Sequence, residues 1–178
     1  MDPSTVIDFW FQELGPKDWF RKDDAADARI AQQFRTVHGA AARGELWDWR
    51  SSAPGALAEI IVLDQFSRNI FRNHPRAFAT DGMALVLAQE AVRHCLDREL
   101  SPAQRSFMYM PFMHSESVRI HETAVELFSQ PGLEENLDFE LRPQGDYRPV
   151  WALSSSQSDF GPSLHPGRSA FLKNSPGF

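Results

Sequence analysis

The chain has 178 residues, of which 42% are hydrophobic and 24% are charged, and its net charge of −6 argues against a nucleic-acid partner. This length suits one domain with a substantial core, and the only cysteine, Cys95, excludes a disulfide framework or a multi-cysteine zinc site. No apolar run approaches the ~20 residues of a membrane helix and no secretory signal is found, so we expect a cytoplasmic protein without a membrane partner.

Residues 2–44 predict two helices. Asp2, followed by proline, can cap and start the first one, and Gly15 ends it. The second helix stops at Gly44 and carries an apolar stripe at helical spacing, which consists of Ile30, Phe34, Val37 and Ala41. Aromatic residues crowd the first twenty positions beyond what one helix face can bury, so they predict a core or a groove between helices. They are Phe9, Trp10, Phe11, Trp19 and Phe20.

Two further helices are expected in the middle of the chain. Pro54 opens a helix over about 54–72, and the Asn73–Pro75 sequence breaks it. Thr80 is a good N-cap for the next helix, which we expect to continue through Cys95.

A capping box, made by Ser101 with Gln104, begins a long helical segment that runs to about Phe128. Pro111 lies inside this segment and should kink or split it. No segment alternates with period two between turn signals, so no strand is expected. Five or six helices with short connectors predict an all-α bundle of antiparallel helical hairpins, although no exact tetratricopeptide repeat is found.

The composition of the sequence changes after residue 142. In 143–168, 12 of 26 residues are Pro, Gly or Ser, and helical periodicity is lost. We therefore expect a helical domain over 1–142 and an irregular C-terminal tail over 143–178.

The densest polar cluster lies within the helix expected at 54–72. Asp64, Arg68 and Arg72 form one row along it, and Gln65 and Asn69 form the adjacent row. Such a face could bind a carboxylate or phosphate through its guanidinium groups. The alternative is a solvated helix face whose ion pairs satisfy one another.

A second cluster, 107–116, combines aromatic and Met residues with three polar residues at its end. The break at Pro111 could open the lip of a pocket, where His114 would act as a general base with Glu116 or Asp64 as its carboxylate. The alternative is a buried His114 that is only hydrogen-bonded. The ligand-binding candidates of both clusters are Gln65, Arg68, Asn69, Arg72, Tyr109 and Ser115.

No metal or cofactor is expected. His114 and His121 lie seven residues apart, about 10.5 Å along a straight helix, which is too far for one metal ion. The sequence has no HExxH pattern, glycine-rich phosphate loop or EF-hand loop. Cys95 lies in the apolar row of its helix and is expected to be a small buried residue.

Several strings resemble one bacterial family, domain-of-unknown-function family number 924. They are FWF at 9–11, WF at 19–20, LDQFSRNIFR at 63–72, AFATD at 77–81 and FMYMPFMHSES at 107–117. The resemblance covers about residues 6–142 and implies a tetratricopeptide-like α-α superhelix, but no reaction. His121 departs from the pattern, where Gln is expected. The candidate residues within the signature strings are Asp64, Gln65, Arg68, Asn69, His114, Ser115 and Glu116.

Two functions stay open at this point. The first is a helical scaffold whose groove binds a protein partner or a small anionic ligand. The alternative is a small hydrolase or lyase that uses His114 with a carboxylate, while Arg68 holds an anion. We expect the Asp64–Arg68–Arg72 row and the His114–Glu116 corner to face a shared cavity. Convergence of Asp64, Arg68 and His114 on one cavity, within hydrogen-bond reach, would favour the enzyme, and dispersal of the three on solvent would favour the scaffold.

The stretch 143–168 has a further property at the level of its codons. Codons permitted for Pro143–Gln157 read HKAIIDRFGRFPHRN when the frame moves by one base, and continuing to Arg168 gives LILGRPSTPAE. Both strings resemble the family's tail, and SAFLKNSPGF at 169–178 resembles its end in the frame as given. We therefore hypothesise two compensating single-base changes, near Arg142 and Arg168, which would deprive the chain of a basic, aromatic final helix.

Overall fold

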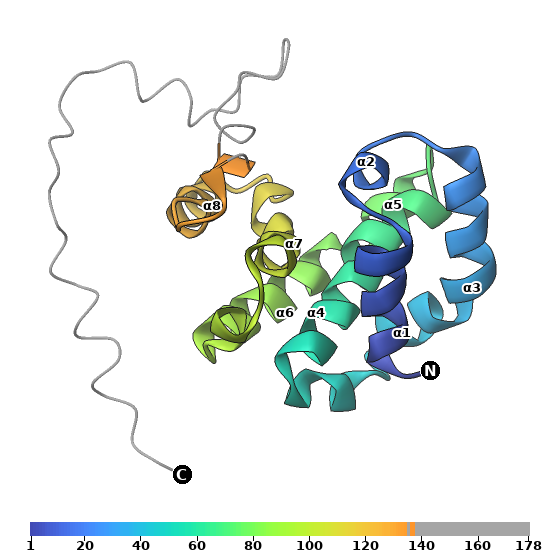
Figure 1. Cartoon of the computed structure of the whole chain (residues 1–178), viewed down its shortest axis with the longest axis horizontal. Helices are drawn as coiled ribbons and strands as arrows, with labels where there is room; N and C mark the ends of the chain where they lie inside the picture. Colours follow the sequence, from blue (N-terminus) through green and yellow to red (C-terminus); the bar gives the residue numbers. More distant parts are fainter. Residues whose placement is uncertain (135, 138–178) are drawn as a thin grey trace, which may run out of the picture. The chain divides into compact units, whose positions relative to one another are not determined.

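A computed structural model of the chain describes residues 1–134, 136 and 137, and this part contains helices and turns but no strand. The all-α prediction is therefore confirmed (Figure 1). Two π-helical turns, η1 (Phe9–Glu13) and η3 (Val62–Phe66), continue α1 and α4, and three 3-10 turns lie in connectors: η2 (Trp47–Ser51), η4 (Pro75–Phe78) and η5 (Leu96–Glu99). The α-helices are α1 (Pro3–Asp8), α2 (Pro16–Trp19), α3 (Asp24–Ala42), α4 (Ala53–Ile61), α5 (Ser67–Ile70), α6 (Asp81–Arg93), α7 (Pro102–Met113) and α8 (Val118–Phe128).

The run α4–η3–α5 is the central helix of the described domain. It matches the helix expected over 54–72, and every residue from Gly55 to Ser67 is buried. A helix that is apolar on all sides must be covered on all sides. Accordingly α1 and α3 pack on one side of it and α6 and α7 on the other (Figure 1). Burial of each Leu or Ile side chain contributes about 2 kcal/mol.

Two of the three predicted caps are confirmed. The Asp2 carboxylate accepts from Ser4 N at the start of α1, and Ser101 and Gln104 form the capping box of α7. Thr80 precedes α6 as expected, but its side chain makes no capping bond. Its hydroxyl instead donates to the carbonyl of Leu63 at 2.7 Å.

The long segment from Ser101 to Phe128 is split, as its internal proline predicts. Pro111 lies in the last turn of α7, which ends at Met113, and α8 begins again at Val118. The prediction for Cys95 is wrong. Helix α6 ends at Arg93, and Cys95 lies in a turn with a φ of 61° and is only partly buried.

The aromatic residues of the N-terminal segment enter the core unequally. Phe9 and Trp10 are buried and pack against Phe66, with ring centroids 6.2 and 5.6 Å apart. Phe107 meets the rest of the cluster from α7, including Phe20, which is itself 69% exposed. The irregular tail expected at 143–178 and the frame hypothesis for 143–168 lie outside the described residues. The tetratricopeptide-like arrangement stays a prediction.

Candidate active site

Asp64 is the centre of the site. Its side chain is 1% exposed and lies in the π turn η3, in the middle of the central helix. Its Oδ1 is 2.8 Å from both Nδ1 of His114 and Nη1 of Arg68. Its Oδ2 accepts from Nε2 of Gln65 at 2.6 Å. A buried carboxylate of this kind needs all of its partners, because an unpaired charge is very costly away from water.

Electrostatics keep Asp64 ionised. Burial alone would raise the pKa of its carboxyl, but the charge and hydrogen bond of His114, the charge of Arg68 and the hydrogen bond of Gln65 together lower that pKa below its ordinary value of 3.8. The site therefore contains a fixed negative charge at neutral pH.

Arg68 links Asp64 to a second carboxylate. Its Nη1 and Nη2 each lie 3.0 Å from an oxygen of Asp81, and Nη1 also donates to the backbone carbonyl of Asp64 at 2.9 Å. The exposed ring of Phe78 lies beside it, with its centroid 5.5 Å from the guanidinium carbon. The sequence predicts that Arg68 holds an anionic ligand. In the structure, Nη1 and Nη2 of Arg68 are instead bound by carboxylates of the protein itself, those of Asp64 and Asp81.

His114 has one nitrogen bound and one open. It follows α7 as its C-cap residue, and its side chain is 29% exposed. Because Asp64 is an ionised acceptor, Nδ1 of His114 donates to it and carries the ring proton of the neutral imidazole. Within the described part of the chain, Nε2 has no hydrogen-bond partner. Neutral His114 therefore presents a lone pair at Nε2.

Irregular helix geometry concentrates at this site. The π turn η3 carries Asp64 and Gln65, and the second π turn, η1, packs against it through Trp10 and Phe66. On the facing helix, Pro111 lies three residues before His114, and Met110 is 3.2 Å from Gln65 Nε2. π turns occur frequently at functional sites, because they redirect side chains out of the regular helical pattern.

Other predicted site residues lie elsewhere. Arg72 and Asn69 both donate to the carboxylate of Asp27 on α3. Arg72 leaves the row of Asp64 and Arg68 because α5 ends at Ile70. The Tyr109 hydroxyl is on another face of α7 and donates to Asp97 at 2.6 Å.

Burial, followed by the hydrogen bond to Asp97, raises the pKa of Tyr109. Glu116 is exposed, and Ser115 accepts from the backbone N–H of Ser117 at 3.2 Å in the turn after α7. The carboxylate bonded to His114 is thus Asp64, and among the described residues no hydrogen bond or ion pair joins His114 to Glu116.

Sequence reasoning missed several residues around Asp64. Asp81 lies thirteen residues after Arg68, beyond the reach of helical spacing arguments. Ser67 and Thr80 donate to the Leu63 carbonyl behind the π turn, and His38 contacts Ser67. Ser67 and Thr80 stand within the signature strings at 63–72 and 77–81, which is the one signal that could have indicated them.

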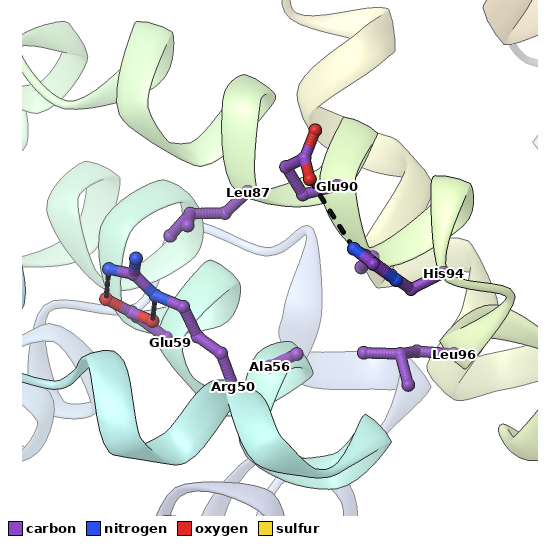
Figure 2. Close-up of a pocket in the computed structure, with 8 residues that line it drawn as sticks. Arg50, Ala56, Glu59, Leu87, Glu90, His94 and Leu96 are labelled. Atoms are coloured by element: carbon purple, nitrogen blue, oxygen red, sulfur yellow. Dashed lines mark hydrogen bonds and ion pairs between the residues drawn. The ribbon is translucent and has the colours of Figure 1, made fainter. Parts of the chain in front are cut away.

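A pocket of about 300 Å³ lies elsewhere, between α4 and α6 (Figure 2). On one wall, Arg50 makes two hydrogen bonds to the carboxylate of Glu59, at 2.7 and 2.8 Å. On the other wall, an oxygen of Glu90 lies 3.7 Å from Nε2 of His94. The charged residues of this pocket pair with one another, so it contrasts with the open imidazole of His114.

Two further findings, on membrane spans and on metal sites, apply to the described residues. No helix among them is long and apolar enough to cross a membrane. Over the same residues, no three His, Cys, Asp or Glu side chains gather closely enough to hold a metal ion.

The fold and the site together define an all-helical protein in which a buried Asp64 is hydrogen-bonded to a partly exposed His114. The family model described as "bacterial protein of unknown function", DUF924, matches residues 6–149, so the chain belongs to this family and the resemblance is confirmed. The chain is similar to the solved structure of a protein of unknown function from Agrobacterium tumefaciens, at 38% sequence identity and a TM-score of 0.70, over 79% of this chain and 82% of that chain. No curated protein matches.

Proposed function

We propose that this protein is an enzyme that takes a proton from a small molecule or from water, with Nε2 of His114 as the general base and Asp64 as its supporting carboxylate. Hydrolases and lyases are the reaction classes that use such a step. The observation that carries the proposal is the 2.8 Å hydrogen bond between the buried Asp64 and Nδ1 of a partly exposed His114.

This arrangement suits proton transfer for three reasons. The bond at Nδ1 fixes the tautomer, so that the lone pair is at Nε2. The ionised carboxylate stabilises the imidazolium that forms when Nε2 takes a proton. Gln65 and Arg68 hold the carboxylate in place, so the base does not have to be oriented at the moment of reaction.

Convergence supports the enzyme over the scaffold. Asp64, Arg68 and His114 come from two helices, and the Arg68 and His114 nitrogens meet at one carboxylate oxygen. A scaffold needs no such contact, and its polar helix face would be solvated. Because Arg68 is bound by Asp64 and Asp81, its role in the proposal is to position Asp64.

The first test asks whether Nε2 of His114 reacts. Diethylpyrocarbonate modifies neutral imidazole nitrogens, and mass spectrometry locates the modified residue. We expect His114 to be modified and to lose most of its reactivity in Asp64→Asn, where the amide no longer supports a charged ring. His74 is a matched internal control, since it is exposed and its Nδ1 accepts from Arg76 N.

The second test asks for turnover. A panel of chromogenic esters, amides, phosphate esters and elimination substrates should contain one whose turnover falls by about 10²-fold or more in His114→Gln. His121→Gln is the matched control and should leave the rate unchanged. An unreactive His114, or turnover that persists in His114→Gln, would contradict the proposal.

A further inference from the structure

The carbonyl oxygen of Leu63 accepts two side-chain hydroxyls inside the π turn that carries Asp64. Ser67 Oγ and Thr80 Oγ1 each lie 2.7 Å from Leu63 O and donate to it. The next carbonyl, that of Asp64, also accepts from a side chain, Nη1 of Arg68. A π turn departs from the regular hydrogen-bond ladder of the α-helix, and here side chains donate to two of its carbonyls.

A buried histidine on α3 supports one of the two hydroxyls. Nε2 of His38 is 2.7 Å from Ser67 Oγ. Thr80 Oγ1 lies 2.9 Å from Ser67 Oγ, but both hydroxyl protons are directed at Leu63 O. Because the Ser67 proton is directed at Leu63 O, Ser67 accepts from Nε2–H of His38. Ser67 is 0% and His38 is 7% exposed, so water does not readily replace a lost bond.

We propose that Ser67 and Thr80, supported by His38, are positioning residues for the proposed base: they fix the π turn and thereby hold the Asp64 carboxylate against Nδ1 of His114. This inference rests on the proposed function. Leu63 precedes Asp64 directly, so the backbone that the hydroxyls hold is the backbone that sets the direction of the carboxylate.

The hydrogen bonds from Ser67 and Thr80 matter because a π turn is less favourable than a regular α-helical turn. A turn that relaxed toward α-helical geometry would rotate Asp64 about the helix axis and withdraw it from His114. Functional side chains need to be held within about 0.5 Å of their working geometry, and neighbouring hydrogen bonds provide this. Ser67 and Thr80 approach the same carbonyl from two elements, α5 and the residue before α6.

The test measures the tautomer of His114, which is independent of any substrate. Ring-nitrogen NMR shifts of the full chain, at a pH where the imidazole is neutral, report which nitrogen carries the proton. We expect the Nδ1–H form in the wild type. In Thr80→Val, which keeps the shape of the side chain and removes the hydroxyl, we expect a mixture in which Nε2–H predominates. Ser67→Ala should shift the tautomer in the same direction.

Two controls separate positioning from general stability. Thr80→Ser restores a hydroxyl and should return His114 to the Nδ1–H form. Thr123→Val is a matched control, since its hydroxyl makes only an exposed contact with the Arg119 carbonyl. Should Ser67→Ala fail to fold, the Thr80 variants decide, because Thr80 is partly exposed.

The outcomes distinguish this inference from the proposed function. A wild type without the Nδ1–H tautomer would overturn both. A wild type in the Nδ1–H form whose tautomer persists in folded Thr80→Val and Ser67→Ala would overturn only the positioning role.

Discussion

Two buried carboxylates in this molecule are held by arginine in different ways. Glu59 is 0% exposed, and its two oxygens accept from one arginine, Arg50 (Figure 2). Asp64 is 1% exposed, but its arginine, Arg68, is divided between Asp64 and Asp81. His114 completes the hydrogen bonding of Asp64 and carries an open nitrogen at its other end.

The difference shows that burial of a charge does not by itself define a site. The Glu59 pair is closed, since the geometry of a guanidinium fork matches that of a carboxylate and leaves no group for a substrate. The Asp64 carboxylate also accepts a hydrogen bond from a ring that reaches the surface. Substitutions in the Glu59 pair should therefore lower the free energy of unfolding. Substitutions in the Asp64 pair should change the tautomer and reactivity of His114.

The largest loss of stability is expected for Arg50→Ala. It leaves the carboxylate of Glu59 buried without its partner, and removing one member of such a pair costs about 3 kcal/mol. Urea unfolding measures the loss. The diethylpyrocarbonate reactivity of His114 should stay at the wild-type level. A loss of stability within experimental error would show that water replaces Arg50, which is itself 36% exposed.

Asp64→Asn should have a smaller effect on stability and a larger one on His114. The amide keeps the size of the side chain but weakens its bonds to His114 and Arg68, at a cost of about 2 kcal/mol. We expect His114 to lose the Nδ1–H tautomer in nitrogen NMR. Glu59→Gln is the matched substitution in the closed pair, and a tautomer change there would erase the distinction between the two pairs.

The contrast also shows what sequence reasoning could and could not reach. Helical periodicity, capping residues and Pro111 were enough to predict most of the helices, because those signals are local in the sequence. Spacing placed Asp64 and Arg68 on one face, but it also placed Arg72 there. Helix α5 ends at Ile70, so Arg72 leaves the row, and Asp27, which binds Arg72, comes from 45 residues away in the chain. Spacing could not place Asp81 or His38, since tertiary packing brings them to the central helix, although Asp81 stands in the signature string at 77–81.

The free energy of unfolding should depend on pH in two separate ranges, an upper window set by His38 and a lower window set by Asp64. Burial, followed by the charges of Arg76 and Arg35, lowers the pKa of His38 from its ordinary value of 6.5. As the pH falls, the unfolded chain therefore takes up this proton before the folded chain does. The contribution of His38 to the free energy of unfolding is complete above pH 6.5 and is lost as the pH falls below it. Asp64 has a lowered pKa as well, so its contribution is lost only below about 3.8.

Urea midpoints measured from about pH 7 down to about pH 3 test both windows. His38→Gln should flatten the upper window, and Asp64→Asn should flatten the lower one. A wild type whose midpoint does not change between about pH 7 and about pH 5 would contradict the burial of a neutral His38.

Phe78→Ala should have the smallest effect among the substitutions. The ring is 62% exposed and lies over the guanidinium of Arg68, a contact worth about 0.5 kcal/mol at an exposed site. Differential scanning calorimetry should show a shift of only about 1–2 °C, with the His114 tautomer unchanged. A change of tautomer would mean that the ring, and not only Asp81, holds Arg68 in place.

The last prediction changes none of the described side chains and concerns the gene. If 143–168 is read in a shifted frame, sequencing should find codons that spell HKAIIDRFGRFPHRN one base on, with single-base changes near Arg142 and Arg168. The strongest constraint comes from Trp151, whose single codon permits few shifted readings. Codons incompatible with the shifted string would refute the hypothesis.

The shifted reading would also change the charge of the C-terminal segment. The restored string has four basic residues and one acidic residue, against a chain with a net charge of −6. We therefore expect the restored chain to melt at a higher temperature than the present one, with the excess reduced by salt, since attraction between opposite charges at a surface is screened.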